Sequence, residues 1–80
     1  MGVRILFLGP LRDLAGEPER ELPAPLDWTG LLAAVAPEVA EQLREPRVHV
    51  ACGGRVLTDK TRLNARDGDE IALLPPVSGG

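Results

Sequence analysis

The chain has 80 residues, with nine Lys and Arg against twelve Asp and Glu, so its formal net charge is −3. This length allows one small domain and leaves no room for a second hydrophobic core. The acidic balance and the presence of one Phe and one Trp exclude a nucleic-acid-binding protein that relies on a basic groove or an aromatic stacking platform. A single Cys and a single His exclude an internal disulfide, a multi-cysteine zinc site and most His-centred metal clusters.

The N-terminal segment does not have the pattern of a targeting sequence. The apolar run 3–8 is too short for a signal peptide, and Gly9-Pro10 interrupts it. No apolar stretch approaches the length of a membrane span. The lone Cys52 is compatible with a reducing interior. We therefore expect a cytoplasmic protein that does not contact a membrane.

The first predicted element is a strand over residues 3–9, because this short apolar run ends at Pro10. Alternate side chains of a strand point to opposite faces. One predicted face is apolar and consists of Val3, Ile5 and Phe7. The other face is only half apolar, so we expect it to be covered or used for binding; it consists of Arg4, Leu6 and Leu8.

A short helix, an edge strand and a longer broken helix follow. Residues 10–15 suit one helical turn that Gly16 stops, and the charged run 19–22 suits an edge strand. Asp27 is a good N-cap for apolar residues at helical spacing, while Pro37 ends or restarts the helix. We therefore predict a broken helix over 27–45.

The remaining elements are a hairpin and a last strand. Residues 47–52 and 55–58 flank Gly53-Gly54, a strong two-residue hairpin signal, and residues 59–66 read as a polar turn region. The turn at Asp67-Gly68 leads into a strand over 71–74. Two early strands, a crossing helix and three late strands predict an α+β fold, with a helix on one face of a mixed sheet of about five strands. The last strand would then lie beside the first, which is the layout of a β-grasp, ubiquitin-like domain.

Groups for catalysis within the domain are scarce. Asp67-Gly68-Asp69-Glu70 lacks the spacing of a calcium loop, and an Asp-Gly turn is the better interpretation. His49 and Cys52 stand three apart on one predicted strand, so they point to opposite faces and cannot form a nucleophile–base pair. Cys52 is favoured as a small buried filler over a reactive thiol. Catalysis by the domain itself is therefore not expected.

The C-terminus carries the candidate chemistry. Proline has no backbone N–H to donate to a neighbouring strand, so Pro75-Pro76 should end the last strand. We therefore predict a domain over 1–74 and a flexible tail over 75–80. The two prolines restrict the exit direction, while glycine has no side chain that would obstruct a narrow site. Such a tail could place its terminal carboxylate inside a partner enzyme. The tail consists of Pro75, Pro76, Val77, Ser78, Gly79 and Gly80.

The run 67–80 closely resembles the C-terminal signature of the molybdopterin synthase small subunits, the MoaD-type sulfur carriers. Residues 3–7 and 11–16 resemble that family's opening strand and short helix. The run 48–52 and its turn match more loosely, since many relatives carry an Asn where Cys52-Gly53 stands here. The resemblance spans essentially the whole chain, and it implies a β-grasp fold.

The resemblance also implies a two-stage sulfur transfer at the terminal carboxylate of Gly80. An ATP-dependent adenylating enzyme forms an acyl-adenylate, and a sulfur donor then replaces AMP to leave a thiocarboxylate. Two small subunits pair with a dimer of large subunits and pass the sulfur to a pyranopterin precursor. The chain itself would bind no cofactor, because its partner uses the ATP. On this interpretation Gly79 gives steric clearance at the terminus, and the partner-binding residues are Leu6, Leu8, Leu74, Pro75, Pro76, Val77 and Ser78.

Three other interpretations stay open. A sulfur carrier for thiamine thiazole synthesis has the same tail chemistry, although such relatives usually lack the proline pair and are shorter between strands two and three. A ubiquitin-like modifier would join Gly80 to lysines of other proteins. A plain interaction module would have an inert tail.

Overall fold

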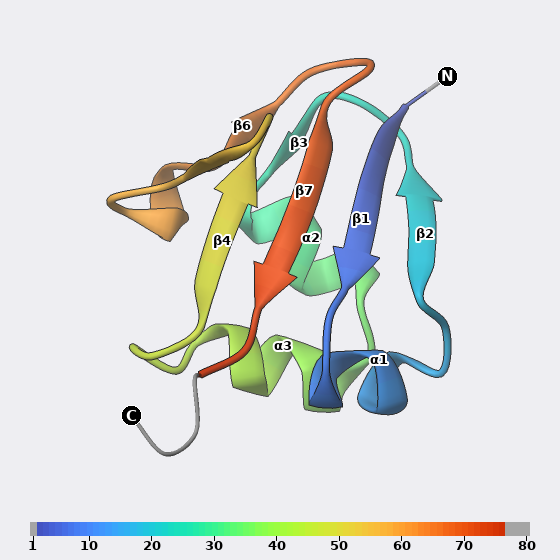
Figure 1. The fold of residues 1–80 in the computed structure, drawn as a ribbon. Coiled ribbons are helices and arrows are strands. Elements are labelled where there is room, and N and C mark those ends of the chain that lie inside the picture. Colours follow the sequence, from blue (N-terminus) through green and yellow to red (C-terminus); the bar gives the residue numbers. More distant parts are fainter. Residues whose placement is uncertain (1, 77–80) are drawn as a thin grey trace.

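The computed structural model describes residues 2–76, and its centre is a mixed sheet of five strands in the order β2-β1-β7-β4-β5 (Figure 1). The central strands β1 and β7 run parallel, and the other neighbours in this sheet pair antiparallel. The strand bounds are β1 (Val3–Phe7), β2 (Glu19–Leu22), β4 (His49–Cys52), β5 (Arg55–Val56) and β7 (Glu70–Leu74). The predicted α+β, β-grasp layout, with the last strand beside the first, is therefore confirmed.

The predicted broken helix consists of two short helices, α2 (Trp28–Ala34) and α3 (Pro37–Leu43). The carboxylate of Asp27 caps α2 by accepting a hydrogen bond of 2.7 Å from the N–H of Gly30. Val35 is extended, and Pro37 takes the first position of the next helix, where its missing N–H costs nothing. Within residues 2–76, no helix is long and apolar enough to cross a membrane.

The short helix α1 (Pro10–Ala15) begins at a proline and ends at Gly16, as predicted. Gly16 has a φ of 79°, the left-handed conformation that commonly ends helices. In the hairpin, Cys52 pairs with Arg55 across Gly53 and Gly54, which both have positive φ. The two-glycine turn predicted between β4 and β5 is therefore confirmed.

The structure corrects the interpretation of residues 59–66 as a polar turn region. This segment contains a 3-10 helix, η1 (Lys60–Arg62), and a strand, β6 (Asn64–Ala65), that pairs antiparallel with β3 (Leu26–Asp27). Leu63 and Ala65 are buried in the core. The sequence pattern missed this second sheet because two-residue strands are too short to show a period, and their pairing joins distant parts of the chain.

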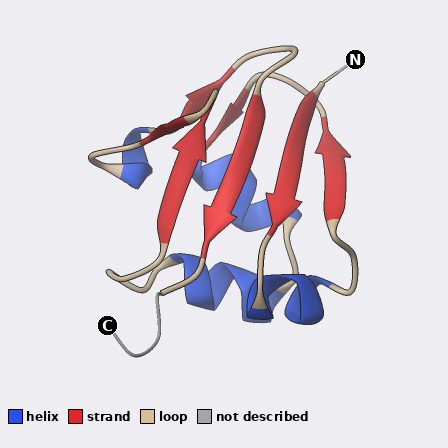
Figure 2. Ribbon diagram, viewed as in Figure 1, coloured by secondary structure: helices blue, strands red, loops and turns tan. Residues whose placement is uncertain are grey.

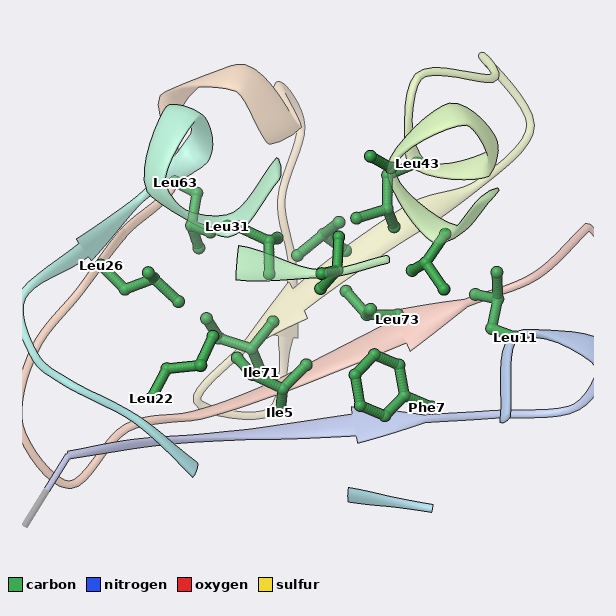
Figure 3. Packing of buried hydrophobic residues seen from close by; sticks show 14 of the residues in the cluster. Ile5, Phe7, Leu11, Leu22, Leu26, Leu31, Leu43, Leu63, Ile71 and Leu73 are labelled. Carbon is green, nitrogen blue, oxygen red and sulfur yellow. The ribbon is translucent and has the colours of Figure 1, made fainter. Parts of the chain in front are cut away.

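One face of the large sheet packs against the helices and forms the hydrophobic core (Figure 3). Val3, Ile5 and Phe7 are buried, which confirms the predicted inner face of β1. They pack with the inner side chains of β7 and with apolar residues of α2 and α3, including Leu31 and Leu43. Burial of this apolar surface supplies the main driving force for folding.

The other face of the sheet is open in the described part of the chain. Helices α2 and α3 lie behind and below the sheet in the view of Figure 2, and α1 lies at the end where β1 and β7 finish. The outward side chains of β1, β7, β4 and β5 therefore meet solvent on one continuous surface. We call this surface the open face.

Candidate functional site

The base of the tail lies at the end of the central strand β7. Leu74, the last residue of β7, and Pro75 are half-buried, and Pro76 is exposed. The predicted site residues Val77, Ser78, Gly79 and Gly80 lie outside the described residues. The fold thus places the start of the predicted tail at the end of the sheet where α1 and α3 lie (Figure 1).

An apolar row crosses the open face. Cross-strand pairing aligns Leu6 with Ala72, Ala72 with Ala51, and Ala51 with Val56. The two alanines are short and lie between longer side chains, and Val56 is 54% exposed. Leu6, Ala51 and Ala72 are half-buried. Apolar residues that gather on an outward sheet face in this way are typical of a protein-binding surface. We call these four residues the apolar row.

The predicted docking residues lie on or near the apolar row. Leu6 belongs to it and is half-buried, and Leu8, just beyond β1, is 39% exposed. Leu74 also faces outward, since it pairs with the exposed His49. The sequence missed Ala51, Ala72 and Val56, although their alternation with buried neighbours could have indicated an outward face.

The end of the open face farthest from the tail carries charge. Arg4 lies 3.7 Å from a carboxylate oxygen of Glu19 and 3.8 Å from one of Glu70, and its strand neighbour Glu21 is also acidic. These side chains are more than half exposed, so the ion pairs contribute little to stability. This end of the open face carries one Arg and three Glu, so its net charge is negative. A negative charge there favours a partner with a basic surface.

A groove of about 590 Å³ lies between α1, α3 and the base of the tail. Its walls are mostly apolar and include Leu14, which is 42% exposed, together with Gln42 and Arg47. Pro75 and Pro76 form the side that belongs to the tail. The sequence did not predict this groove, because its residues come from three separate segments that only the fold brings together.

Cys52 is partly buried against the core, in agreement with the predicted filler role. Its Sγ lies 3.9 Å from a carboxylate oxygen of Asp69. Burial and this negative charge both raise the pKa of the Cys52 thiol, which disfavours the reactive thiolate. His49 pairs with Leu74, whereas Cys52 pairs with the buried Ile71, so the two side chains do lie on opposite faces. In residues 2–76, no three His, Cys, Asp or Glu side chains are grouped to hold a metal ion.

These features define a ubiquitin-like protein: a β-grasp domain with an open sheet face, in which the central strand β7 leads into the predicted tail. The chain belongs to the ThiS family, whose profile matches residues 5–80. It is therefore a protein of the ThiS/MoaD sulfur-carrier type. No curated protein is similar enough in sequence to count as a relative.

Solved structures with the same fold come from bacteria and archaea. The Helicobacter pylori complex of subunits 1 and 2 of the molybdopterin-converting factor contains a chain with 28% identity and a TM-score of 0.66, covering all of both chains. A putative molybdopterin converting factor subunit 1 from Pyrococcus furiosus has 26% identity and a TM-score of 0.64, covering 94% of this chain and 97% of that one. The small archaeal modifier protein 1 of Methanosarcina acetivorans has the same fold, with a TM-score of 0.73 and 24% identity. The match covers 98% of this chain and 95% of that one.

Proposed function

We propose that this chain is the small subunit of a molybdopterin synthase, a protein that carries sulfur as a thiocarboxylate on Gly80. The observation that carries the proposal is the full-length similarity to a chain in a complex of the two molybdopterin-converting subunits. The C-terminal run 67–80, with its proline pair before the two glycines, supports the same choice.

The proposed chemistry belongs to the main-chain terminus and to partner enzymes. A carboxylate is a poor electrophile, so an adenylating enzyme first attaches AMP from ATP and thereby supplies a leaving group. Sulfur at the sulfide level, supplied by a sulfur donor, then attacks the carbonyl carbon; a C–S bond forms, the C–O bond to AMP breaks, and a thiocarboxylate remains. The sulfur finally passes to the pyranopterin precursor in the large subunit. Acid–base and electrostatic groups come from the partners, and the side chains of this domain need only bind and orient.

The proposed docking surface for the large subunit is the open face together with the base of the tail. The apolar row, Leu8 and Leu74 supply the apolar contact area. Because β7 contributes to this surface and also leads into the tail, a partner bound there is already next to the start of the tail. Two copies of the chain would bind a dimer of large subunits, each copy serving one active site.

The proposal is tested by intact mass spectrometry of the chain after incubation with its adenylating enzyme, ATP and a sulfur donor. We expect one oxygen to be replaced by sulfur, and the modified chain should then convert the precursor to molybdopterin when the large subunit is added. A chain with one residue appended after Gly80 is the control, because it should fold normally and accept no sulfur. A wild-type chain that stays unmodified with the correct partner enzyme contradicts the proposal.

The same modified chain separates the alternatives. Sulfur transfer to thiazole synthase, with none to the molybdopterin large subunit, would assign the chain to thiamine synthesis. Stable conjugates between Gly80 and lysines of other proteins would make it a modifier, an alternative that the shared fold with an archaeal modifier keeps in view.

The docking surface has its own test in the substitution Leu8→Asp. A carboxylate placed in an apolar interface loses its hydration, so we expect the affinity for the large subunit to fall by about 10-fold or more. The control is Thr29→Asp, which adds the same charge at an exposed position of α2, behind the sheet. Equal affinities of the two variants in calorimetry would show that the large subunit does not bind near Leu8.

A further inference from the structure

The ends of β1 and β7 lie side by side, because the two strands are parallel and paired up to Phe7 and Leu73 (Figure 1). Gly9 follows Phe7 by two residues, and Pro75 follows Leu73 by two residues. The same register, continued past the strand ends, brings Gly9 opposite Pro75. The turn into α1 and the start of the tail are therefore neighbours in space.

Gly9 and Pro75 are close enough that a side chain on Gly9 would press on the proline. Gly9 has a φ of 55° and a ψ of −133°, and a Cβ placed on it would lie 3.3 Å from Cγ of Pro75. Carbon atoms pack best at about 3.5–4.0 Å. The other glycines with positive φ in residues 2–76 have nothing within 4 Å of such a Cβ, namely Gly16, Gly53, Gly54 and Gly68. Gly9 thus combines a conformation that favours glycine with a close neighbour.

The ring of Pro75 is rigid, so its contact with Gly9 affects the direction of the main chain after Pro75. The pyrrolidine ring of Pro75 is part of the backbone and cannot rotate away as a flexible side chain would. A displacement of the ring therefore changes the path of the main chain that follows it. Gly80 stands five residues beyond Pro75, and misplacement of a reacting group by about 1 Å can cost about 100-fold in rate.

We propose that Gly9 is a positioning residue for the reaction at Gly80. Its backbone, free of a Cβ, allows Pro75 to pack against the turn before α1, and this contact sets the direction in which the tail leaves the sheet. The inference rests on the proposed function only in requiring that a partner adenylates Gly80, a step that sulfur carriers and modifiers share.

The first test is a direct measurement of the contact in the wild-type chain. We expect a nuclear Overhauser effect between an α-proton of Gly9 and the ring protons of Pro75, because a Cβ replacing that proton would lie 3.3 Å from the ring. Absence of this signal in an otherwise well-resolved spectrum overturns the proposal.

The second test uses the chain as the substrate of its adenylating enzyme and separates kcat from KM. Gly9→Ala should lower kcat by about 10- to 100-fold and leave KM within about twofold, because the substitution changes no side chain of the proposed docking surface. Gly16→Ala is the control for alanine at a positive φ, because it places alanine at a φ of 79° and a ψ of 8° at the other end of α1 with nothing nearby. The ψ of Gly9 is −133°, so the Pro75→Ala variant described below separates the ring contact from backbone strain. Gly16→Ala should keep kcat within about twofold of wild type. Equal kcat values for the two glycine variants overturn the proposal.

Pro75→Ala is a second variant for the kinetic test, and it leaves the backbone of Gly9 unstrained. It replaces Gly9→Ala if circular dichroism shows that Gly9→Ala does not fold. Pro75→Ala removes the ring from the same contact and should also lower kcat. In the double variant the losses should not multiply, because both changes break one contact. A Pro75→Ala chain with wild-type kcat, or fully multiplicative losses, contradicts the proposal. If the wild-type chain is not adenylated at all, the proposed function fails with it, whereas normal wild-type turnover with equal variants refutes only the role of Gly9.

Discussion

Leu73 and Leu74 are adjacent in β7 and offer the sharpest test of the two-faced sheet. Leu73 is fully buried in the core (Figure 3) and pairs with Phe7 and Val50. Leu74 is half-buried on the open face. Substitution of either leucine by alanine removes the same atoms from neighbouring positions of one strand. The structure predicts that Leu73→Ala destabilises the fold, and the proposed docking surface predicts that Leu74→Ala weakens binding to the large subunit.

The expected sizes of the two effects differ. Leu→Ala in a closed core costs about 2–5 kcal/mol, since the transfer term is joined by the cavity left behind. At Leu74 the three carbon atoms removed are each worth about 0.8 kcal/mol when fully buried, so half burial gives about 1 kcal/mol and leaves no closed cavity. An 80-residue domain has a free energy of unfolding of about 4–12 kcal/mol. Leu73→Ala therefore removes a large fraction of it.

Urea denaturation and calorimetric binding together measure both effects. Leu73→Ala should lower the denaturation midpoint by about 1–2 M and leave the affinity of the folded chain for the large subunit within about twofold. Leu74→Ala should change the midpoint little and lower the affinity by about 10-fold, as expected for one central contact of an interface. Equal losses of stability, or a loss of affinity that follows Leu73 instead of Leu74, would refute the assignment of the two faces.

Three further substitutions test local features. Gly2→Ala should lower the free energy of unfolding by about 1–3 kcal/mol in urea melts, because the new Cβ would collide with the backbone carbonyl oxygen of Leu22; an unchanged melt would contradict the close approach. Asp69→Asn should speed alkylation of Cys52 by iodoacetamide several-fold, because loss of the negative charge lowers the raised pKa of the thiol; unchanged kinetics would show that Asp69 does not act on it. Hydrogen bonds donated by the side chain and the backbone N–H of Thr61 lower the pKa of Asp59 below its ordinary 3.8. The ionised carboxylate therefore stabilises the fold above that pH, and this stabilisation is lost as the pH falls through the lowered pKa. The melting temperature of Asp59→Ala should be lower than that of the wild type at pH 7 and equal to it at about pH 2. A difference in melting temperature that does not depend on pH would show that the ionised carboxylate is not its cause.

The elements that depend on local signals could be predicted from the sequence. Alternation placed Val3 and Phe7 in the core, and the capping carboxylate of Asp27 and the ring of Pro37 gave the two-part helix. The glycine pair gave the hairpin. Each of these signals acts within a few residues of where it stands in the chain. The small β3–β6 sheet was missed because its strands are too short to carry a pattern.

The candidate site could be predicted only where it is continuous in sequence. The tail and the outward residues of β1 are such segments. Of the apolar row, only Leu6 was predicted from the sequence. Ala72 lies beside Leu6 and Ala51 only because of the register of three strands. The groove beside α1 and the contact between Gly9 and Pro75 likewise depend on the parallel pairing of the two ends of the chain.

We propose that the reactive group of this protein is the carboxylate of Gly80. Intact mass measurement of the chain, after incubation with its adenylating enzyme, ATP and a sulfur donor, tests it most directly. We expect a mass increase equal to the difference between sulfur and oxygen, located by fragmentation at Gly80. A chain that keeps its original mass, although the enzyme is active on a known carrier, would contradict it.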